Sequence, residues 1–273
     1  MGRAATRLAR MSEAIKDAYD LEGIPESYGR NTELFKAEAF ILSYVREEIE
    51  NKAILDIGVG AGRTVPYLTA LTSSYTGIDY SQNMLRYCRD RHPGAKLLQC
   101  DARNMDLFQD GAFDVVVATW NVIDDADHAG RLKILNEVRR VLRPRGLFIF
   151  STHNRDFQTR SAYRFRGFVS APNPINLIKC NAIRIKRYVT GILNHLDVKR
   201  SEIHNREYAV INDPSHNFRL LTYYIGKESQ LAQLTRIGFS DIEMVDEGGS
   251  FITPLQECLD GWIYYICRRS GER

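Results

Sequence analysis

The segment Ala53–Arg63 constrains the fold of this chain more than any other. Its sequence, AILDIGVGAGR, is an apolar run that leads into three alternate glycines. The run has the length of a buried strand, and glycines directly after a strand leave backbone N–H groups that a ligand can approach without interference from a Cβ atom. Pro66 then suits the first turn of a helix, where its missing N–H would have no partner. We therefore expect a strand, a ligand-binding turn and a helix.

Strands and helices alternate along the next hundred residues. The strand candidates are short and mostly apolar, as expected for strands that are buried on both faces of a parallel sheet. They cover residues 53–57, 75–79, 96–100, 113–119 and 147–152. Ser81 is expected to cap a helix that runs to Arg91, and Asp127 a longer helix that stops at Pro144. This alternation predicts an α/β fold with a doubly wound, mostly parallel sheet.

A helical segment precedes the alternation of strands and helices, and the alternation returns at the end of the chain. Asn31 or Thr32 can cap a helix that ends near Asn51, so residues 1–50 precede a core that spans residues 51–154. Residues 226–273 resume the core pattern with a helix that Gly238 closes and two strands. These three elements are expected at residues 227–237, 242–245 and 262–267.

The alternation fails between residues 155 and 225. This region is rich in arginine, asparagine and aromatic residues, and two strand candidates in it, residues 202–210 and 218–225, are joined by the strong turn signal Asn212–Ser215. We interpret residues 155–225 as an inserted α+β cap that binds the substrate.

Composition excludes several classes of protein. The chain is 44% hydrophobic and 26% charged, which is typical of soluble globular proteins. No apolar run approaches the roughly 20 residues that a bilayer span requires, and residues 1–10 lack the apolar region of a secretory signal. The five cysteines form no C-x-x-C pair, which argues against a disulfide framework or a zinc knuckle. We therefore expect a cytoplasmic protein without a membrane span.

Two positions distinguish between possible ligands of the glycine turn. The dinucleotide-binding pattern G-x-G-x-x-G/A would need glycine or alanine where this chain has Arg63. Asp56, two residues before the first glycine, would oppose a pyrophosphate but suits a ligand that carries an ammonium group. The turn therefore favours a cationic ligand.

The spacing Asp56-x-Gly58-x-Gly60-x-Gly62 resembles the cofactor motif of class I S-adenosylmethionine (SAM) dependent methyltransferases of the small-molecule type. The resemblance covers roughly residues 50–152 and the closing strands after residue 226. Val141–Leu147 is similar to the family's turn into the fifth strand. The resemblance implies a seven-stranded Rossmann-like sheet with an antiparallel last strand, and SAM as the cofactor.

The resemblance also implies roles for single residues. Asp79 corresponds to the acid that accepts both ribose hydroxyls, Asp101 and Ala102 to residues that contact the adenine, and Met84 to an apolar residue that packs on it. Trp120 and Asn121 are expected near the methionine part of SAM. The full set of expected cofactor residues is Asp56, Gly58, Gly60, Gly62, Arg63, Asp79, Tyr80, Met84, Asp101, Ala102, Trp120, Asn121 and Tyr28. Tyr28 belongs to a segment, Tyr28–Arg30, that resembles the mobile N-terminal lid of the family, or is a plain surface loop.

The sequence leaves the catalytic residues open. The methyl group of SAM is already activated, so the enzyme mainly has to align the acceptor, and it needs a base only where the acceptor must lose a proton. His153 and His128 follow strand ends and are the best candidates for this base, with a structural role as the alternative for each. Asp124 and Asp125 follow the fourth predicted strand too, and a helix-capping or solvated position is an equal alternative to a role in the site.

The positive charge of the inserted cap is compatible with two classes of substrate. Residues 155–220 carry a net charge of +7, which suits either a pocket for a small, acidic metabolite or an RNA-binding face. We prefer the small molecule, because the charge is dispersed and no known RNA-binding module is present. The tyrosines in or beside the cap can pack or line the pocket: Tyr163, Tyr188, Tyr208, Tyr223 and Tyr224.

Absent motifs narrow the reaction. Thr119–Val122 replaces the Asn/Asp-Pro-Pro-Tyr loop of methyltransferases that act on planar amide or base nitrogens, and the Pro-Cys pair of cytosine carbon-5 chemistry does not occur. His195, His204 and His216 lack close metal-ligand spacing, so we expect no metal. The prediction is methylation of an N or O atom of a metabolite, with C-methylation, RNA methylation and a non-catalytic SAM-binding regulator as alternatives.

Overall fold

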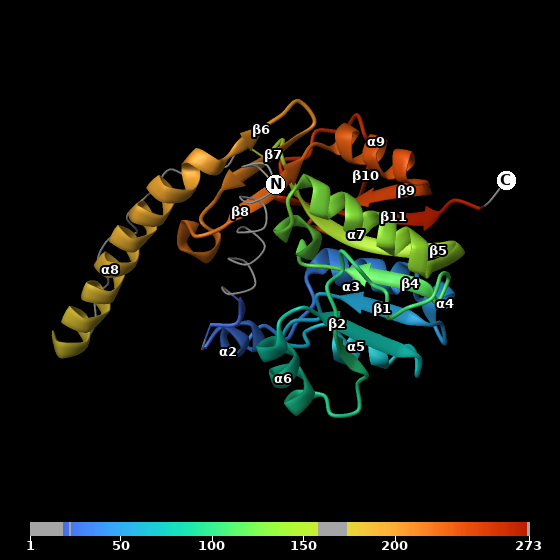
Figure 1. Ribbon diagram of the computed structural model, residues 1–273, viewed down its shortest axis with the longest axis horizontal. Helices are drawn as coiled ribbons and strands as arrows, with labels where there is room; N and C mark the ends of the chain where they lie inside the picture. The colour runs from blue at the N-terminus through green and yellow to red at the C-terminus, as the bar shows by residue number, and fades with distance from the viewer. Residues whose placement is uncertain (1–18, 22, 158–173, 272–273) are drawn as a thin grey trace.

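A mixed sheet runs through the computed structural model, which describes residues 19–21, 23–157 and 174–271 (Figure 1). The main strand order is β10-β9-β11-β5-β4-β1-β2-β3. The parallel strands are β1 (Ile54–Ile57), β2 (Tyr75–Asp79), β3 (Leu97–Gln99), β4 (Phe113–Ala118) and β5 (Leu142–Asn154). β11 (Trp262–Arg269) lies antiparallel between β5 and β9 (Phe239–Val245), and β10 (Phe251–Ile252) pairs with β9. The predicted Rossmann-like sheet with its antiparallel last strand is therefore confirmed.

Helices cover both faces of this sheet (Figure 1). One face packs against α3 (Lys36–Tyr44), α4 (Arg46–Ile49), α5 (Val65–Thr69) and α6 (Gln82–Arg91), and the other against α7 (His128–Val141) and α9 (Lys227–Ile237). The side chains of β5 alternate between these layers. Phe148 and Phe150 join the cluster under α7 and α9, whereas Leu147 and Ile149 join the cluster under α3 to α6.

The local signals in the core place several helix ends correctly. The Ser81 hydroxyl caps α6 by accepting a hydrogen bond from the backbone N–H of Met84 (3.1 Å), and the Asp127 carboxylate caps α7 through Gly130 (2.6 Å). Pro66 lies in the first turn of α5. Gly238 ends α9 with a left-handed backbone, φ 102°.

Two predicted boundaries are wrong. The helix before the sheet is capped at Phe35, not at Asn31 or Thr32, because the Glu38 carboxylate accepts a hydrogen bond from the Phe35 N–H (2.9 Å); it breaks at Val45 into α3 and α4. The next error concerns α7 and β5. The helix stops at Val141, three residues earlier than predicted, and β5 begins at once, since Leu142 already pairs with β4.

The inserted region extends the sheet. β6 (Ile203–His204), β7 (Tyr208–Asn212) and β8 (Leu221–Ile225) form an antiparallel unit, and β8 also pairs in parallel with the end of β5. The predicted strand 202–210 is in fact two strands, because a turn between Asn205 and Tyr208 folds β6 back onto β7. The pairing of β8 with β5 places Tyr224 opposite His153.

A long helix, α8 (Pro174–Val198), precedes this unit and projects from the body of the molecule (Figure 1). The sequence analysis did not predict it. Within the described residues, no helix combines the length and the apolar character needed to cross a membrane. A short helix, α2 (Ile24–Gly29), lies near α6. Parts of two predicted regions lie outside the described residues. These are residues 1–18 of the N-terminal segment and residues 158–173 of the cap, which include Tyr163.

Candidate active site

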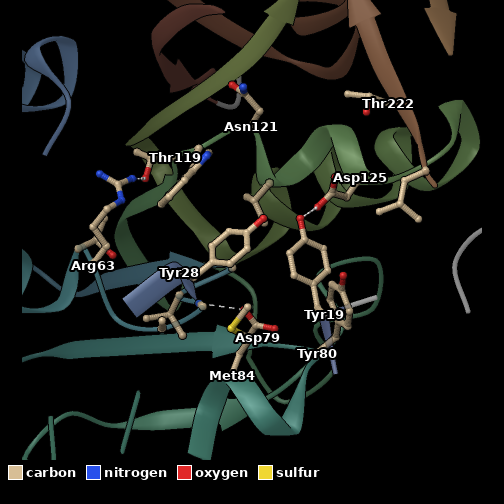
Figure 2. A pocket seen from close by; sticks show the side chains of 18 of the residues that line it. Tyr19, Tyr28, Arg63, Asp79, Tyr80, Met84, Thr119, Asn121, Asp125 and Thr222 are labelled. Atoms are coloured by element: carbon tan, nitrogen blue, oxygen red, sulfur yellow. Dashed lines mark hydrogen bonds between the residues drawn. The ribbon is translucent and has the colours of Figure 1, made fainter. Parts of the chain in front are cut away.

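The carboxyl ends of the parallel strands open into a cleft with two cavities. The first has a volume of about 170 Å³ and the second of about 420 Å³. They share the lining residues Gly58, Asp79, Tyr80, Val122 and Asp125, so they form two ends of one site. Figure 2 shows side chains of the first cavity, which come from the glycine turn, the ends of β2 and β4, and the segment that carries Tyr19 and Tyr28. A site at this edge is the arrangement typical of doubly wound sheets.

The glycine turn depends on the absence of side chains. Gly58, Gly60 and Gly62 all have positive φ angles. A Cβ atom on Gly58 would come within 2.0 Å of the Val122 side chain, whereas one on Gly60 would meet nothing closer than 3.8 Å. Gly58 is therefore required for packing, and the space beside Gly60 is open to a ligand.

Asp79 joins this turn to the second strand. Its Oδ2 accepts a hydrogen bond from the N–H of Gly60 (2.9 Å) and its Oδ1 accepts one from Ser81 (2.8 Å). Burial raises the pKa of Asp79 to about 6. Each carboxylate oxygen retains a lone pair, so Asp79 can still accept hydrogen bonds from two ligand hydroxyls.

Most of the expected cofactor residues line the cleft. Those in the first cavity are Gly58, Gly60, Arg63, Asp79, Tyr80, Met84, Trp120, Asn121 and Tyr28, and the second cavity adds Asp101 and Ala102. Asp101 binds Arg103, with 2.9 Å between Oδ1 and Nε. The Arg63 guanidinium lies over the rings of Phe35 and Trp120 and forms a buried ion pair with Glu38, so it ties the glycine turn to α3.

Two expected cofactor residues face away from both cavities. The Asp56 carboxylate is buried behind the turn, where it accepts hydrogen bonds from Thr64 (2.6 Å) and Tyr75 (2.9 Å), and burial raises its pKa to about 6. The structure thus corrects the expectation that Asp56 meets an ammonium group of the ligand; it stabilises the turn instead. Gly62 packs against Cys88 and His92.

The two candidate bases differ sharply in position. His128 lies outside both cavities, where its ring stacks on Tyr208 (4.1 Å between centroids) and its Nδ1 is 2.9 Å from the Tyr223 hydroxyl. His153 lines the first cavity at the end of β5. Its Nδ1 is 2.8 Å from Oδ2 of Asp124, and its Nε2 is 3.3 Å from Nδ2 of Asn121. Of the two, only His153 can contact a ligand in the cleft.

Asp124 holds His153 in this orientation. It is fully buried and accepts hydrogen bonds from the backbone N–H of His153 (2.7 Å) and the Thr152 hydroxyl (2.8 Å), while Arg131 forms an ion pair with it. A buried carboxylate in this position favours the tautomer that carries its proton on Nδ1 and leaves Nε2 as an acceptor. The interpretation of Asp124 as a capping or solvated residue is wrong, because its side chain is fully buried and its negative charge is paired with Arg131.

Sequence reasoning missed several other residues of the cleft. Tyr19 donates a hydrogen bond to Asp125 (2.8 Å) across the first cavity, and Leu220 and Thr222 reach it from the inserted region. Asp125 is therefore not a capping residue either. Trp120 and Asn121 both have left-handed backbones, φ 57° and 56°, which non-glycine residues adopt at a cost and which cluster at functional sites. No local sequence signal marks these features, since each depends on a distant partner.

The cleft fits SAM by its open turn and its polar groups. The space beside Gly60 admits a ligand against bare backbone, and Asp79 can accept from ribose hydroxyls. The Tyr80 hydroxyl and Asn121 Oδ1 are buried without a hydrogen-bond partner in the part of the chain that the structure describes. Buried polar atoms normally have partners, so these two atoms are available to a ligand. Within the same residues, no group of His, Cys, Asp or Glu is arranged to hold a metal ion.

The known proteins that resemble this chain are methyltransferases. A family model described as a methyltransferase domain matches residues 55–150. A fatty-acid O-methyltransferase from Mycolicibacterium smegmatis is 27% identical over 220 residues, which are 77% of each chain. A phthiotriol/phenolphthiotriol dimycocerosates methyltransferase from Mycobacterium tuberculosis is 36% identical over 108 residues, which are 38% of each chain.

Solved structures show the same fold. A SAM-dependent methyltransferase from Clostridium acetobutylicum superposes with a TM-score of 0.56 at 15% identity, over 86% of this chain and 92% of the other. The methyltransferase model covers the glycine turn and the four strands that follow it, which are the elements that build the cleft. Residues 55–150 therefore match a methyltransferase domain, in a chain that has the fold of SAM-dependent methyltransferases, and SAM is the cofactor that this match implies.

Proposed function

We propose that the protein transfers the methyl group of SAM to an N or O atom of a small molecule, with His153 as the general base. The contact between His153 and Asp124 carries this proposal. The contact orients the ring so that Nε2 lies at the cavity beside the Asn121 amide, and in the tautomer that Asp124 favours this nitrogen is a proton acceptor. A base in this position is useful for an acceptor that still carries a proton, such as a hydroxyl or a protonated amine.

The walls of the cavity favour an amphipathic acceptor. Trp120 and Tyr28 lie 5.3 Å apart between ring centroids, and Trp262 and Leu220 add apolar surface. Asn121 and Thr222 supply polar groups among these apolar walls. Two relatives are named for fatty acids and for phthiotriol dimycocerosates, which supports an oxygen atom of a lipid-like molecule as the acceptor.

The chemistry needs little more than alignment and a proton acceptor. SAM supplies an activated methyl group when bound. Asp79 and the glycine turn would hold its nucleoside, and Tyr19 and Tyr28 cover the cavity and limit the access of water. His153 would take the acceptor's proton on Nε2, and the negative charge of Asp124 would stabilise the imidazolium that results.

A pair of histidine variants tests this assignment. We expect His153→Ala to lower turnover of a hydroxylated or amine acceptor by about 100-fold or more, because general bases contribute factors of that size, while the affinity for SAM is retained. His128→Ala is the matched control, since that side chain lies outside the cleft. S-adenosylhomocysteine production measures turnover, and calorimetry measures SAM affinity. Equal turnover in the two variants would remove His153 as the base.

A further inference from the structure

Helix α8 presents an apolar stripe to solvent. Large side chains lie on one face of it at spacings of seven, four, four and three residues, and Ile178, Leu193 and Leu196 are each more than 60% exposed. Ile185 and Val189 are 45% and 49% exposed and continue the stripe. The helix points away from the sheet and its covering helices (Figure 1), so the body of the molecule leaves this stripe open. A row of exposed apolar side chains of this length indicates a surface that binds something.

The charge around the stripe is almost entirely positive. Residues 174–201 contain six lysine and arginine residues against one acid, Asp197. Lys179 and Lys186 are exposed, seven residues apart, and lie roughly 90° around the helix from the apolar stripe. Lysines at the flank of an apolar face can extend their charged ends towards phosphate groups while their stems cover apolar surface.

This combination favours an anionic lipid surface over a second copy of the chain. Two copies of α8 would bring like charges together along their whole length, whereas anionic headgroups would neutralise them. The helix also lacks the apolar character needed to span a bilayer, so it can only lie in the interface. We propose that α8 binds the surface of an anionic membrane through its apolar stripe and its flanking lysines.

Hydrogen bonds connect this helix to the cleft. His195 of α8 lies 2.7 Å from Asn212, measured from its Nδ1 to the amide oxygen, and Asn212 in turn donates to the backbone oxygen of Leu220 (2.7 Å). Leu220 lines the first cavity. A docked α8 would therefore hold the inserted wall of the cavity close to the membrane, where an acceptor dissolved in lipid could enter. This last step rests on the proposed function, whereas membrane binding does not.

Vesicle binding by the full chain tests the proposal. We expect the protein to sediment with vesicles of phosphatidylcholine that contain about 30% phosphatidylglycerol, and roughly tenfold less with phosphatidylcholine alone. V189D/L193D should reduce binding by at least about tenfold, because it places charge on the apolar stripe. Leu255→Asp, at a side chain that is 94% exposed outside α8, is the matched control. K179E/K186E should reduce vesicle binding by a similar factor, because it removes the positive charge beside the stripe. Its control is K133E, on the exposed side of α7.

Three results would overturn membrane docking. The first is that the parent protein and all variants bind neutral and anionic vesicles equally. The second is a dimer in sedimentation equilibrium that V189D/L193D converts to monomer without any vesicle binding, which would assign the stripe to a second copy. The third is binding to an RNA oligonucleotide that K179E/K186E abolishes and V189D/L193D leaves unchanged. Turnover of a soluble acceptor separates the two proposals: its loss with vesicle binding intact contradicts the proposed function alone, and the reverse contradicts docking alone.

Discussion

Gly60 and Asp79 form a small hydrogen-bonded unit in the cleft where we expect the cofactor. The N–H of Gly60 donates to the Asp79 carboxylate, and the left-handed backbone of Gly60, φ 52°, turns the chain so that this bond can form. A β-branched residue adopts that conformation only with strain. The space beside Gly60 is open, so the strain comes from the backbone and not from a clash with neighbouring protein atoms.

Gly60→Val should therefore weaken both the fold and the binding of SAM. We expect a loss of about 1–3 kcal/mol in the free energy of unfolding from backbone strain, and at least about tenfold weaker SAM binding because the new side chain occupies ligand space. Calorimetric titration and urea unfolding measure the two effects. Gly94→Val is the control, since Gly94 has open space around it and lies outside the cleft. SAM affinity as strong as in the Gly94 variant would show that the ligand does not approach Gly60.

Asp125 gives the protein a measurable pH dependence. Burial raises the pKa of Asp125 to about 7, whereas an unfolded aspartate titrates near about 3.9. Between these values the folded chain binds more protons than the unfolded chain at this site, so the free energy of unfolding falls as the pH rises. Asp125→Asn keeps an oxygen that can accept from Tyr19 but does not titrate. We expect it to lose less stability between about pH 5 and pH 7.5 than the parent.

Urea unfolding at both pH values measures this difference. Asp90→Asn, at an exposed position outside the cleft, should behave like the parent. Asp56 and Asp79 have pKa values that burial raises to about 6, so part of the pH dependence will persist in the Asp125 variant. A variant whose loss of stability equals that of the parent would mean that Asp125 titrates normally in the folded protein.

At the scale of elements, one buried arginine joins four of them. Arg131 of α7 is fully buried and contacts Asp124 near the start of α7, Thr152 of β5 (3.2 Å) and Gln230 of α9 (2.6 Å). Its guanidinium also lies 4.6 Å from the centre of the Tyr223 ring of β8. The helices that cover one face of the sheet and the strand β5, which carries His153, thus share a single polar centre.

Arg131→Met should show how much this centre contributes. The change leaves the Asp124 charge buried without its ion-pair partner, which typically costs about 3–5 kcal/mol. We expect a decrease of that size in the free energy of unfolding by urea. Arg143→Met removes an exposed ion pair with Asp114 and should cost no more than about 1 kcal/mol. Similar losses in the two variants would contradict a dominant role for the buried pair.

Elements with local signals were predictable from the sequence, and those fixed by distant partners were not. Ser81, Asp127 and Gly238 mark helix ends through hydrogen bonds or backbone angles within a few residues, and these ends are confirmed. Helix α8 was missed because its proline and asparagine residues indicated irregular structure, although the apolar spacing from Ile178 to Leu196 is helical. The strand prediction at 202–210 failed because pairing with β7, not composition, ends β6.

The same distinction applies to the site. The glycine turn and Asp79 could be placed in the cleft because they follow strand ends at a fixed spacing. The sequence could not show which of His128 and His153 faces the cavity, since both come soon after predicted strands. The sequence also could not show that Asp124 is buried, because its burial depends on the ion pair that it forms with Arg131 in the folded protein. The division of the chain into lid, core, cap and closing hairpin stays a prediction.

At the scale of the whole molecule, the cleft is closed by segments that are far apart in the sequence. Tyr19 lies before the sheet, Asp125 follows β4, and Leu220 belongs to the inserted region. Tyr19 packs with Tyr80 against Leu220, and its hydroxyl bonds to Asp125 at 2.8 Å (Figure 2). The first described part of the chain, the core and the insert therefore meet at the first cavity, and their contact should govern how fast a ligand leaves.

Tyr19→Phe tests this closure by removing one oxygen atom. The hydrogen bond to a carboxylate is worth about 1.5–3 kcal/mol, so we expect S-adenosylhomocysteine to dissociate at least about tenfold faster, as measured by stopped-flow fluorescence. Tyr44→Phe is a close control, because Tyr44 also donates to a carboxylate, that of Glu243 (3.2 Å), but lies outside the cleft. If the two variants release the ligand at the same rate, the bond between Tyr19 and Asp125 does not hold the cleft closed, and the rings of Tyr19, Tyr28 and Tyr80 must do so by packing alone.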